Sequence, residues 1–218
     1  GTGDDVLTAG AGDDVLVGVT GDDVLVGGLG LDTYGFNAGD GSDSISGRDG
    51  DDAINGGNGN DGLAGENGND VLRGDAGNDT LQGGVGDDIL DGGADNDVLA
   101  GGRYDTWNGR FDGWGNDTYL FGRGDGQDTI VDDDATAGNV DKLVFKTGVA
   151  LADVQVVRDG DTLFLKINGT TDQVRIDGYF SNDGVSSRHI EEIRFTDSPE
   201  TVWKLQDIKT QALIGTAG

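Results

Sequence analysis

A nine-residue repetition of glycine, aspartate and an aliphatic residue constrains this chain more than any other feature of its sequence. Glycine stands at the fourth position of each copy, aspartate at the sixth and an apolar residue at the eighth, as in Gly12, Asp14 and Leu16. The pattern returns in phase up to about residue 99. A disordered low-complexity tract would not keep this register, so the sequence predicts a repeat architecture in which successive copies stack.

The spacing of the repeat predicts a parallel solenoid. Six turn-forming residues alternate with three extended ones, such as Val15–Val17, and the alternation of side chains in a strand points the middle residue inward. Two half-coils, or eighteen residues, then close one turn. Repeats two apart lie above one another, so that Asp52, Asp70 and Asp88 are expected along one edge and Asp61, Asp79 and Asp97 along the other.

Stacked carboxylates repel one another strongly unless a cation lies between them. A hard divalent ion with six to eight oxygen ligands and tolerant geometry fits such a stack, which favours calcium over magnesium. Glycine earlier in each turn permits the positive backbone angles that aim carbonyl oxygens at an ion. The candidate metal ligands are the repeat-phase aspartates and the fourth-position glycines, namely Asp5, Asp14, Asp23, Asp32, Asp43, Asp52, Asp61, Asp70, Asp79, Asp88, Asp97, Asp117 and Asp128, with Gly12, Gly21, Gly30, Gly50, Gly59, Gly68, Gly77 and Gly86.

These residues closely resemble the repeats of the RTX, or haemolysin-type calcium-binding, family, whose pattern is G-G-x-G-x-D-x-U-x. The resemblance implies an all-β fold, a right-handed parallel β-roll. It also implies several calcium ions, roughly one for each stacked pair of repeats, each held by one aspartate from either turn and by carbonyls of the glycine-rich turn. Between Asp52 and Asp70, the carbonyl of Gly50 and those of its neighbours would then contribute.

Two stretches interrupt the nine-residue period, and they resemble each other. Residues 32–45 and 117–130 share the pattern D-T-Y-x-F-x-x-G-D-G-x-D-x-I, in which two aspartates stand eleven residues apart. Such elements resemble those that close RTX blocks, so we expect the solenoid to change course or width near each, with a break near residues 36–45. The irregular stretch 103–114 contains Trp107 and Trp114, and it either packs over the core or contacts a glycan or cell-surface ligand.

The last third of the chain has an ordinary β pattern and is expected to cap the roll, since an open solenoid end exposes apolar side chains and strand edges. The boundary is placed between residues 1–139 and 140–218. Predicted strands are Lys142–Phe145, Val154–Arg158, Thr162–Ile167, Gln173–Tyr179 and Ile190–Phe195. The order resembles the domain that follows haemolysin-type repeats, and the tail 213–218 is typical of entry into a further repeat block.

Charge and composition exclude several classes of function. The net charge is −28, and residues 1–139 carry 30 acidic against 5 basic residues, so no basic stripe is available for nucleic acid or for an anionic membrane surface. No apolar run is long enough to span a membrane. The absence of cysteine excludes disulfides and thiolate metal sites.

The sequence also contains no catalytic motif. The single histidine, His189, cannot form a zinc-protease pair, and no nucleophile elbow or phosphate-binding loop is present. Because most acids are periodic, they are interpreted as structural, and the chain is not expected to be an enzyme.

The favoured function is a calcium-binding structural and folding module of a secreted or cell-surface bacterial protein. The family resemblance implies export through a type I secretion apparatus, in a parent that is a toxin or an adhesin. Two alternatives remain open: a glycan-binding or cell-surface-binding module that uses residues 103–114, and the non-catalytic C-terminal part of a secreted hydrolase. With no methionine and a repeat at its start, the sequence is expected to be a piece of a longer chain.

Overall fold

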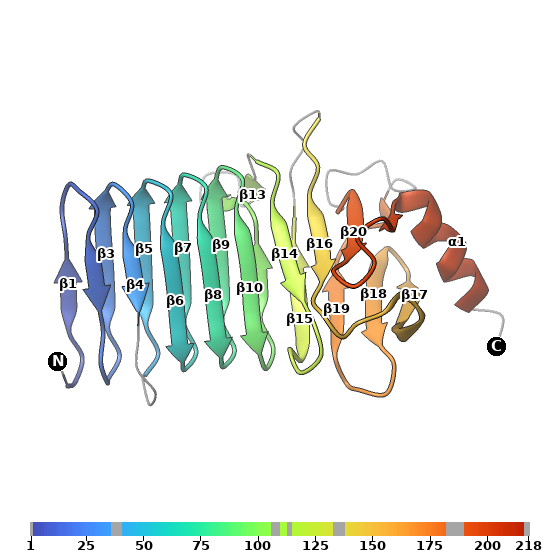
Figure 1. Cartoon of the computed structure of the whole chain (residues 1–218), viewed down its shortest axis with the longest axis horizontal. Helices are drawn as coiled ribbons and strands as arrows, with labels where there is room; N and C mark the ends of the chain where they lie inside the picture. Colours follow the sequence, from blue (N-terminus) through green and yellow to red (C-terminus); the bar gives the residue numbers. More distant parts are fainter. Residues whose placement is uncertain are drawn as a thin grey trace.

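Two long sheets of short strands face each other along the chain and enclose a narrow core, as the computed structural model shows (Figure 1). The structure describes residues 2–35, 41–105, 110–112, 115–132, 138–181 and 190–215. From β1 to β11 successive strands alternate between the two sheets, so each pair of these strands forms one coil. This is the predicted β-roll, and the N-terminal coil and the C-terminal helix lie at opposite ends of it.

The first sheet contains ten strands, in the spatial order β1 (Val6–Thr8), β3 (Val24–Leu29), β5 (Ser44–Asp49), β7 (Gly62–Asn67), β9 (Thr80–Val85), β11 (Val98–Ala100), β15 (Gln127–Val131), β19 (Gln173–Ile176), β18 (Thr162–Ile167) and β17 (Val154–Asp159). The second contains nine, in the order β2 (Val15–Val17), β4 (Thr33–Gly35), β6 (Ala53–Asn58), β8 (Val71–Ala76), β10 (Ile89–Ala94), β14 (Thr118–Phe121), β16 (Lys142–Phe145), β20 (Glu192–Phe195) and β21 (Val202–Trp203). Pairing is parallel until the last strands of each sheet, where β17, β18 and β21 pair antiparallel.

The strands of the regular coils are longer than the sequence indicated. The prediction gave three extended residues for each repeat, whereas β6 and β8 contain six each. The extra residues are the first three of the next repeat, which also pair with the neighbouring coil, as Asn58 does with Ala76. Only the fourth to sixth positions, glycine to aspartate, therefore form the turn.

The eighth-position side chains form the core, as predicted. They stack in register from coil to coil, as Ile54 does on Leu72 and Leu72 on Leu90. The buried residues at this position are Leu16, Leu25, Tyr34, Ile45, Ile54, Leu63, Leu72, Leu81, Leu90, Leu99, Tyr119 and Ile130. Each is at most 5% exposed, so two columns of apolar side chains supply the hydrophobic stabilisation of the roll.

Parallel strand pairing continues through both interruptions of the repeat, and the expected change of course or width there stays a prediction. β3 pairs with β5 across the first interruption, and β11 pairs with β15 across the second, both parallel and in register (Figure 1). In the second interruption the inserted residues lie between β14 and β15. Residues 36–40 of the first interruption lie outside the described residues.

Within the irregular stretch 103–114, β12 (Arg103–Asp105) and β13 (Arg110–Asp112) form a separate antiparallel pair. Trp107 and Trp114, which carry the glycan-binding alternative, lie outside the described residues.

The C-terminal third extends the sheets of the roll and then covers its end. β16 and β20 continue the second sheet, and β19 continues the first, so strands from both sides of the boundary near residue 139 share the same sheets. Four aromatic rings stack through this part: Phe121 lies 6.2 Å from Phe145, Phe145 lies 5.1 Å from Phe195, and Phe195 lies 4.8 Å from Trp203, measured between centroids. This aromatic column closes the core at the C-terminal end.

The last element is a helix, α1 (Leu205–Gly215), which the β-rich prediction for residues 140–218 did not include. A short 3-10 helix, η1 (Leu151–Asp153), precedes β17. Ile208 and Ala212 are buried, and α1 contacts β17 and β21. Leu213 to Gly215, expected to lead into a further repeat block, are helical. Among the described residues, no helix has the length and apolar character needed to cross a membrane.

Candidate metal centres along the aspartate ladders

The sixth-position aspartates form two ladders, one along each edge of the roll. In each ladder the backbone N–H of one aspartate donates a hydrogen bond to Oδ1 of the aspartate in the next coil, over 2.7 to 3.0 Å. One ladder contains Asp5, Asp23, Asp43, Asp61, Asp79, Asp97 and Asp128, and the other contains Asp14, Asp32, Asp52, Asp70, Asp88 and Asp117. All thirteen aspartates selected from the sequence therefore lie in the two predicted stacks.

The fifth-position residues form a second set of contacts that run in the opposite direction. Asn69 N donates to Oδ1 of Asp51 in the preceding coil, while Asp52 N donates to Oδ1 of Asp70 in the following coil, both over 2.7 Å. Where the earlier coil has aspartate or asparagine at the fifth position, the junction between coils is thus held by a reciprocal pair of side-chain to backbone hydrogen bonds. This pairing fixes the vertical register of the ladders, and of each sixth-position carboxylate it uses Oδ1 alone.

That second oxygen is buried and has no hydrogen-bond partner in much of the array. It is Oδ2 in Asp32, Asp52, Asp70, Asp79, Asp88, Asp97 and Asp128. From Asp23 to Asp128, every sixth-position aspartate is at most 3% exposed. A buried carboxylate oxygen without a donor is costly, because desolvation of the charge is not compensated. The repeated orphan oxygens indicate that a positively charged group belongs beside each of them.

The pKa values of these carboxyls record the same cost. Burial, with a smaller contribution from neighbouring carboxylates, raises the pKa of Asp52 to about 6 and that of Asp70 to about 7. The pKa of Asp88 and that of Asp128 rise to about 8, while the hydrogen bond from the preceding coil opposes the shift in each. Without a cation, several of these groups would hold a proton near neutral pH.

First-position glycines form the inner wall of each site. A Cβ on Gly65 would overlap Oδ2 of Asp70 and would lie 2.7 Å from the carbonyl oxygen of Gly83, one coil further along. The same arrangement occurs at Gly47, Gly56, Gly74 and Gly83. A carboxylate oxygen and a carbonyl oxygen thus approach the same point from two coils. This oxygen-only set of donors, with its orphan oxygens, fits calcium.

The fourth-position glycines lie in the turns beside these sites. The eight predicted glycines, Gly12, Gly21, Gly30, Gly50, Gly59, Gly68, Gly77 and Gly86, all have φ between 115° and 138°. The carbonyl oxygen of Gly50 faces the Cα of Gly68, where a Cβ would overlap it. Glycine is therefore required here for a close approach between coils, and the part of these carbonyls in holding an ion stays a prediction.

The sequence reasoning missed two acidic residues at the end of a ladder. Asp117 N donates to Oδ1 of Asp141 over 2.7 Å, and Asp141 N donates to Oε2 of Glu191 over 2.8 Å. Asp141 stands two residues before the buried Leu143, which is the spacing of the repeat, but Asn139 replaces the fourth-position glycine. The spacing of an acidic residue two positions before a buried aliphatic residue would have found Asp141, and Glu191 shows the same spacing before Ile193, fifty residues later.

A lysine lies among acidic residues where the roll meets the cap. Lys146 Nζ is 2.5 Å from Asp91 Oδ1 and 2.8 Å from Asp125 Oδ2. Hydrogen bonds to these two carboxylates raise the pKa of Lys146 against the effect of its partial burial. The chain thus supplies its own cation at this junction.

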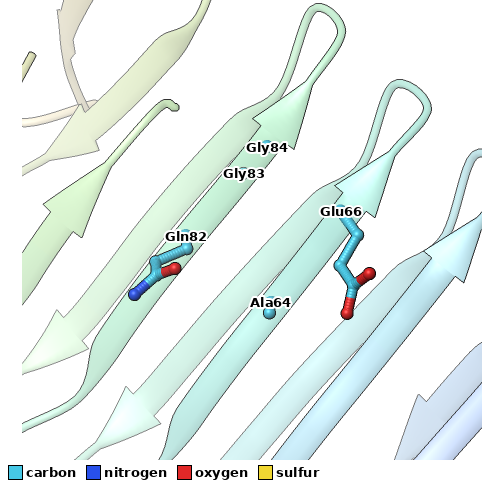
Figure 2. A pocket seen from close by; sticks show the side chains of 5 residues that line it. All are labelled: Ala64, Glu66, Gln82, Gly83 and Gly84. Atoms are coloured by element: carbon cyan, nitrogen blue, oxygen red, sulfur yellow. The ribbon is translucent and has the colours of Figure 1, made fainter. Parts of the chain in front are cut away.

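A shallow pocket lies on the outer face of the roll, between β7 and β9. It is lined by Ala64, Glu66, Gln82, Gly83 and Gly84, and Figure 2 shows the side chains of Glu66 and Gln82 on neighbouring strands. Glu66 Oε1 accepts a hydrogen bond of 2.7 Å from Ser46 Oγ. Glu66 is the one glutamate of residues 1–139, and it stands at the second position of its repeat, where it takes no part in the aspartate ladders.

Comparison with known families agrees with this geometry. Residues 1–34, 36–63 and 64–99 match the RTX calcium-binding nonapeptide repeat (4 copies). The chain carries an RTX repeat array. Residues 163–207 match the haemolysin-type calcium binding protein related domain, so this RTX chain also carries the predicted type of cap. RTX nonapeptide repeats bind calcium ions, and RTX proteins are generally secreted. The repeat family is typically structural and non-catalytic.

Two individual proteins illustrate the similarity. The chain is 42% identical over 93 residues to iron-regulated protein FrpA of Neisseria meningitidis serogroup C. The aligned residues make up 43% of this chain and 8% of that protein. The solved structure of extracellular lipase LipA from Serratia marcescens superposes with 21% sequence identity and a TM-score of 0.41. The match covers 86% of this chain and 38% of the lipase chain. The RTX chain therefore spans well under half the length of either protein.

Gly74→Ala is expected to weaken calcium binding about tenfold, because the new Cβ would overlap Oδ2 of Asp79 and the carbonyl oxygen of Gly92. Isothermal titration calorimetry with calcium measures the effect. Gly62→Ala is the matched control. Gly62 lies in β7, the strand before that of Gly74, and its new Cβ would lie 3.9 Å from the Asp43 carbonyl oxygen, which is an ordinary contact. Equal calcium affinity in the two variants would contradict the assignment of first-position glycines to the site.

Proposed function

We propose that this chain is a calcium-dependent folding module of a secreted bacterial protein. The parent would leave the cell by a type I route, and the module would fold on meeting extracellular calcium. The observation that carries the proposal is the set of buried Oδ2 atoms without hydrogen-bond partners, those of Asp32, Asp52, Asp70, Asp79, Asp88, Asp97 and Asp128. A roll with these charges uncompensated is costly, and the same roll with a divalent ion beside each carboxylate is stable.

Each aspartate is positioned to act on an ion through its second oxygen only. Oδ1 of Asp70, for example, is held by Asp52 N over 2.7 Å, which orients Oδ2 toward Gly65. When bound, calcium supplies the positive charge that offsets the burial of the carboxylates. The hydrogen bonds between coils thereby link each site to its neighbours, so that filling one site orders the aspartate of the next.

Linkage turns this binding into folding. A ligand that binds only the folded form stabilises it by RT ln(1 + [L]/Kd) at each independent site. Calcium sites of extracellular modules typically have dissociation constants of ~10⁻⁴ to 10⁻³ M. Such sites would stay empty at the low calcium concentration inside a cell, so the chain would remain unfolded and suited to export until it emerged.

The proposal is tested by far-ultraviolet circular dichroism of the full chain in EDTA and in millimolar calcium. We expect a coil-like spectrum in EDTA at neutral pH and a β spectrum in calcium, with a sigmoidal titration between them. Magnesium at the same concentration is the control and should restore less structure, because its compact octahedral shell retains water. Identical β spectra in EDTA and in calcium would overturn calcium-dependent folding.

A further inference from the structure

The wall of the aspartate sites changes at the two interruptions of the repeat. In regular coils, the oxygens nearest to a Cβ built on a first-position glycine are an aspartate Oδ2 and the carbonyl of the next coil, as at Gly65. At Gly27 and Gly101, the three atoms nearest to such a Cβ include no carbonyl oxygen. They include a tyrosine hydroxyl oxygen instead. The hydroxyl belongs to Tyr34 beside Gly27 and to Tyr119 beside Gly101.

Both tyrosines occupy the same place in the same sequence element. Each stands two residues after its aspartate, in Asp32-Thr33-Tyr34 and in Asp117-Thr118-Tyr119, at the eighth position, where regular repeats have leucine or isoleucine. Their rings are buried in the core columns, at 2% and 0% exposure. A larger residue than leucine thus brings a polar oxygen from the core side to the wall of the site.

The hydrogen bonds of the two hydroxyls show which way their protons point. Tyr34 Oη donates to the Ser46 carbonyl oxygen over 3.0 Å and accepts from Gly27 N–H. Tyr119 Oη accepts from Gly101 N over 2.8 Å and donates to Asp132 Oδ2 over 3.3 Å. In each case the proton is directed away from the aspartate of the site.

The arrangement at Tyr34 leaves two acceptors face to face. Oδ2 of Asp32 is buried without a hydrogen-bond partner, and the Tyr34 hydroxyl approaches the same point beside Gly27 with its proton already used. A phenol that merely capped the carboxylate would donate its proton to Oδ2. The close approach of two acceptor oxygens is stabilised when a cation lies between them.

We propose that the hydroxyl oxygens of Tyr34 and Tyr119 are neutral ligands that complete the calcium sites of Asp32 and Asp117, where the repeat is interrupted. The inference rests on the proposed calcium binding and adds two residues to it. The tyrosine replaces the carbonyl oxygen of a regular coil, so the array of sites continues through both interruptions.

The test compares Tyr34→Phe and Tyr119→Phe with the wild-type chain by isothermal titration calorimetry with calcium. Phenylalanine keeps the ring in the core and removes only the hydroxyl. We expect each variant to bind one ion fewer, or to bind one ion at least about tenfold more weakly. Tyr179→Phe is the control, since its buried hydroxyl donates to the Ile190 carbonyl oxygen over 3.4 Å in the cap, and it should bind as the wild type does.

Other outcomes separate this inference from the proposed function. An unchanged number and affinity of ions in the two variants overturns the tyrosine assignment, as does one ion more, which would mean that the hydroxyl blocks the site. No calcium binding by the wild-type chain overturns the proposed function itself. If the variants do not fold in calcium, a crystal structure of the wild-type chain with calcium decides: an ion about 2.3 to 2.6 Å from each hydroxyl supports the proposal, and its absence there overturns it.

Discussion

Asp52→Ala is expected to raise the calcium concentration at the midpoint of folding by about tenfold, equivalent to about 1.4 kcal/mol. The substitution removes an orphan Oδ2 that faces the wall at Gly47. It also removes the Oδ1 that accepts the hydrogen bond from Asp32 N, which would leave that buried donor unpaired. A calcium titration followed by circular dichroism measures the midpoint.

Asp51→Ala provides the matched control for this prediction. Asp51 is the adjacent residue, its removal changes the charge equally, and it also loses one hydrogen bond, from Asn69 N. Its side chain is exposed, so water can replace what is lost. We expect less than a twofold shift of the calcium midpoint in Asp51→Ala. Equal shifts in the two variants would mean that net charge, and not a site at the sixth position, governs folding.

Protonation of the buried carboxyls at low pH is expected to stabilise the folded roll in part, as calcium does. The pKa of Asp70 is about 7 and that of Asp88 about 8 in the folded, metal-free roll, mainly because both are buried, against about 3.9 in an unfolded chain. Between about pH 4 and pH 8 the folded form therefore binds more protons than the unfolded form, and its stability falls as the pH rises. In EDTA we expect a β spectrum near pH 4 and its loss near pH 8.

Two variants separate this site-specific effect from the general relief of negative charge. Asp88→Asn imitates the protonated carboxyl and should make the metal-free roll more stable near pH 8. Asp87→Asn, at the adjacent position, should not, because hydrogen bonds from Asn116 lower the pKa of Asp87 and it is charged in either state. The same folded fraction in EDTA at both pH values, or equal behaviour of the two variants, would contradict the role given to the buried carboxyls.

The opposite pH dependence is expected for calcium binding. Protons compete with the ion for carboxylates of raised pKa, so the apparent calcium affinity should fall between about pH 8 and pH 5. The chain should release protons as it binds calcium, which calorimetry in buffers of different ionisation enthalpy measures. A constant affinity over this range would indicate that the ions bind to carboxylates that are already fully ionised.

Much of the array could be predicted because the information is local and periodic. Gly68, Asp70 and Leu72 lie within five residues, and each has its role from its own place in the turn and strand. The alternation of side chains along a strand sends Leu72 into the core, and the eighteen-residue period of two repeats places Asp70 between Asp52 and Asp88. The strands of the cap followed from the same alternation, to within a few residues at their ends.

What the sequence did not indicate depends on contacts between coils. The strands are six residues long because the first three positions of the next repeat also pair with a neighbouring coil, which no single repeat shows. The helix Leu205–Gly215 is placed by contacts of its buried residues with the last strands. Glu191 joins the ladder through Asp141 N, fifty residues away.

The sequence by itself determined that this chain is a stack of glycine and aspartate turns on an aliphatic core, since the nine-residue period specifies each half-coil. Only the tertiary structure decided that the first-position glycines form the wall of each site and that the ladders cross both interruptions. It also decided that Tyr34 and Tyr119 reach the sites at those interruptions. The physical reason is that a metal site of this kind lies between coils, and the distance between two coils is set by packing and hydrogen bonds that a linear pattern does not contain.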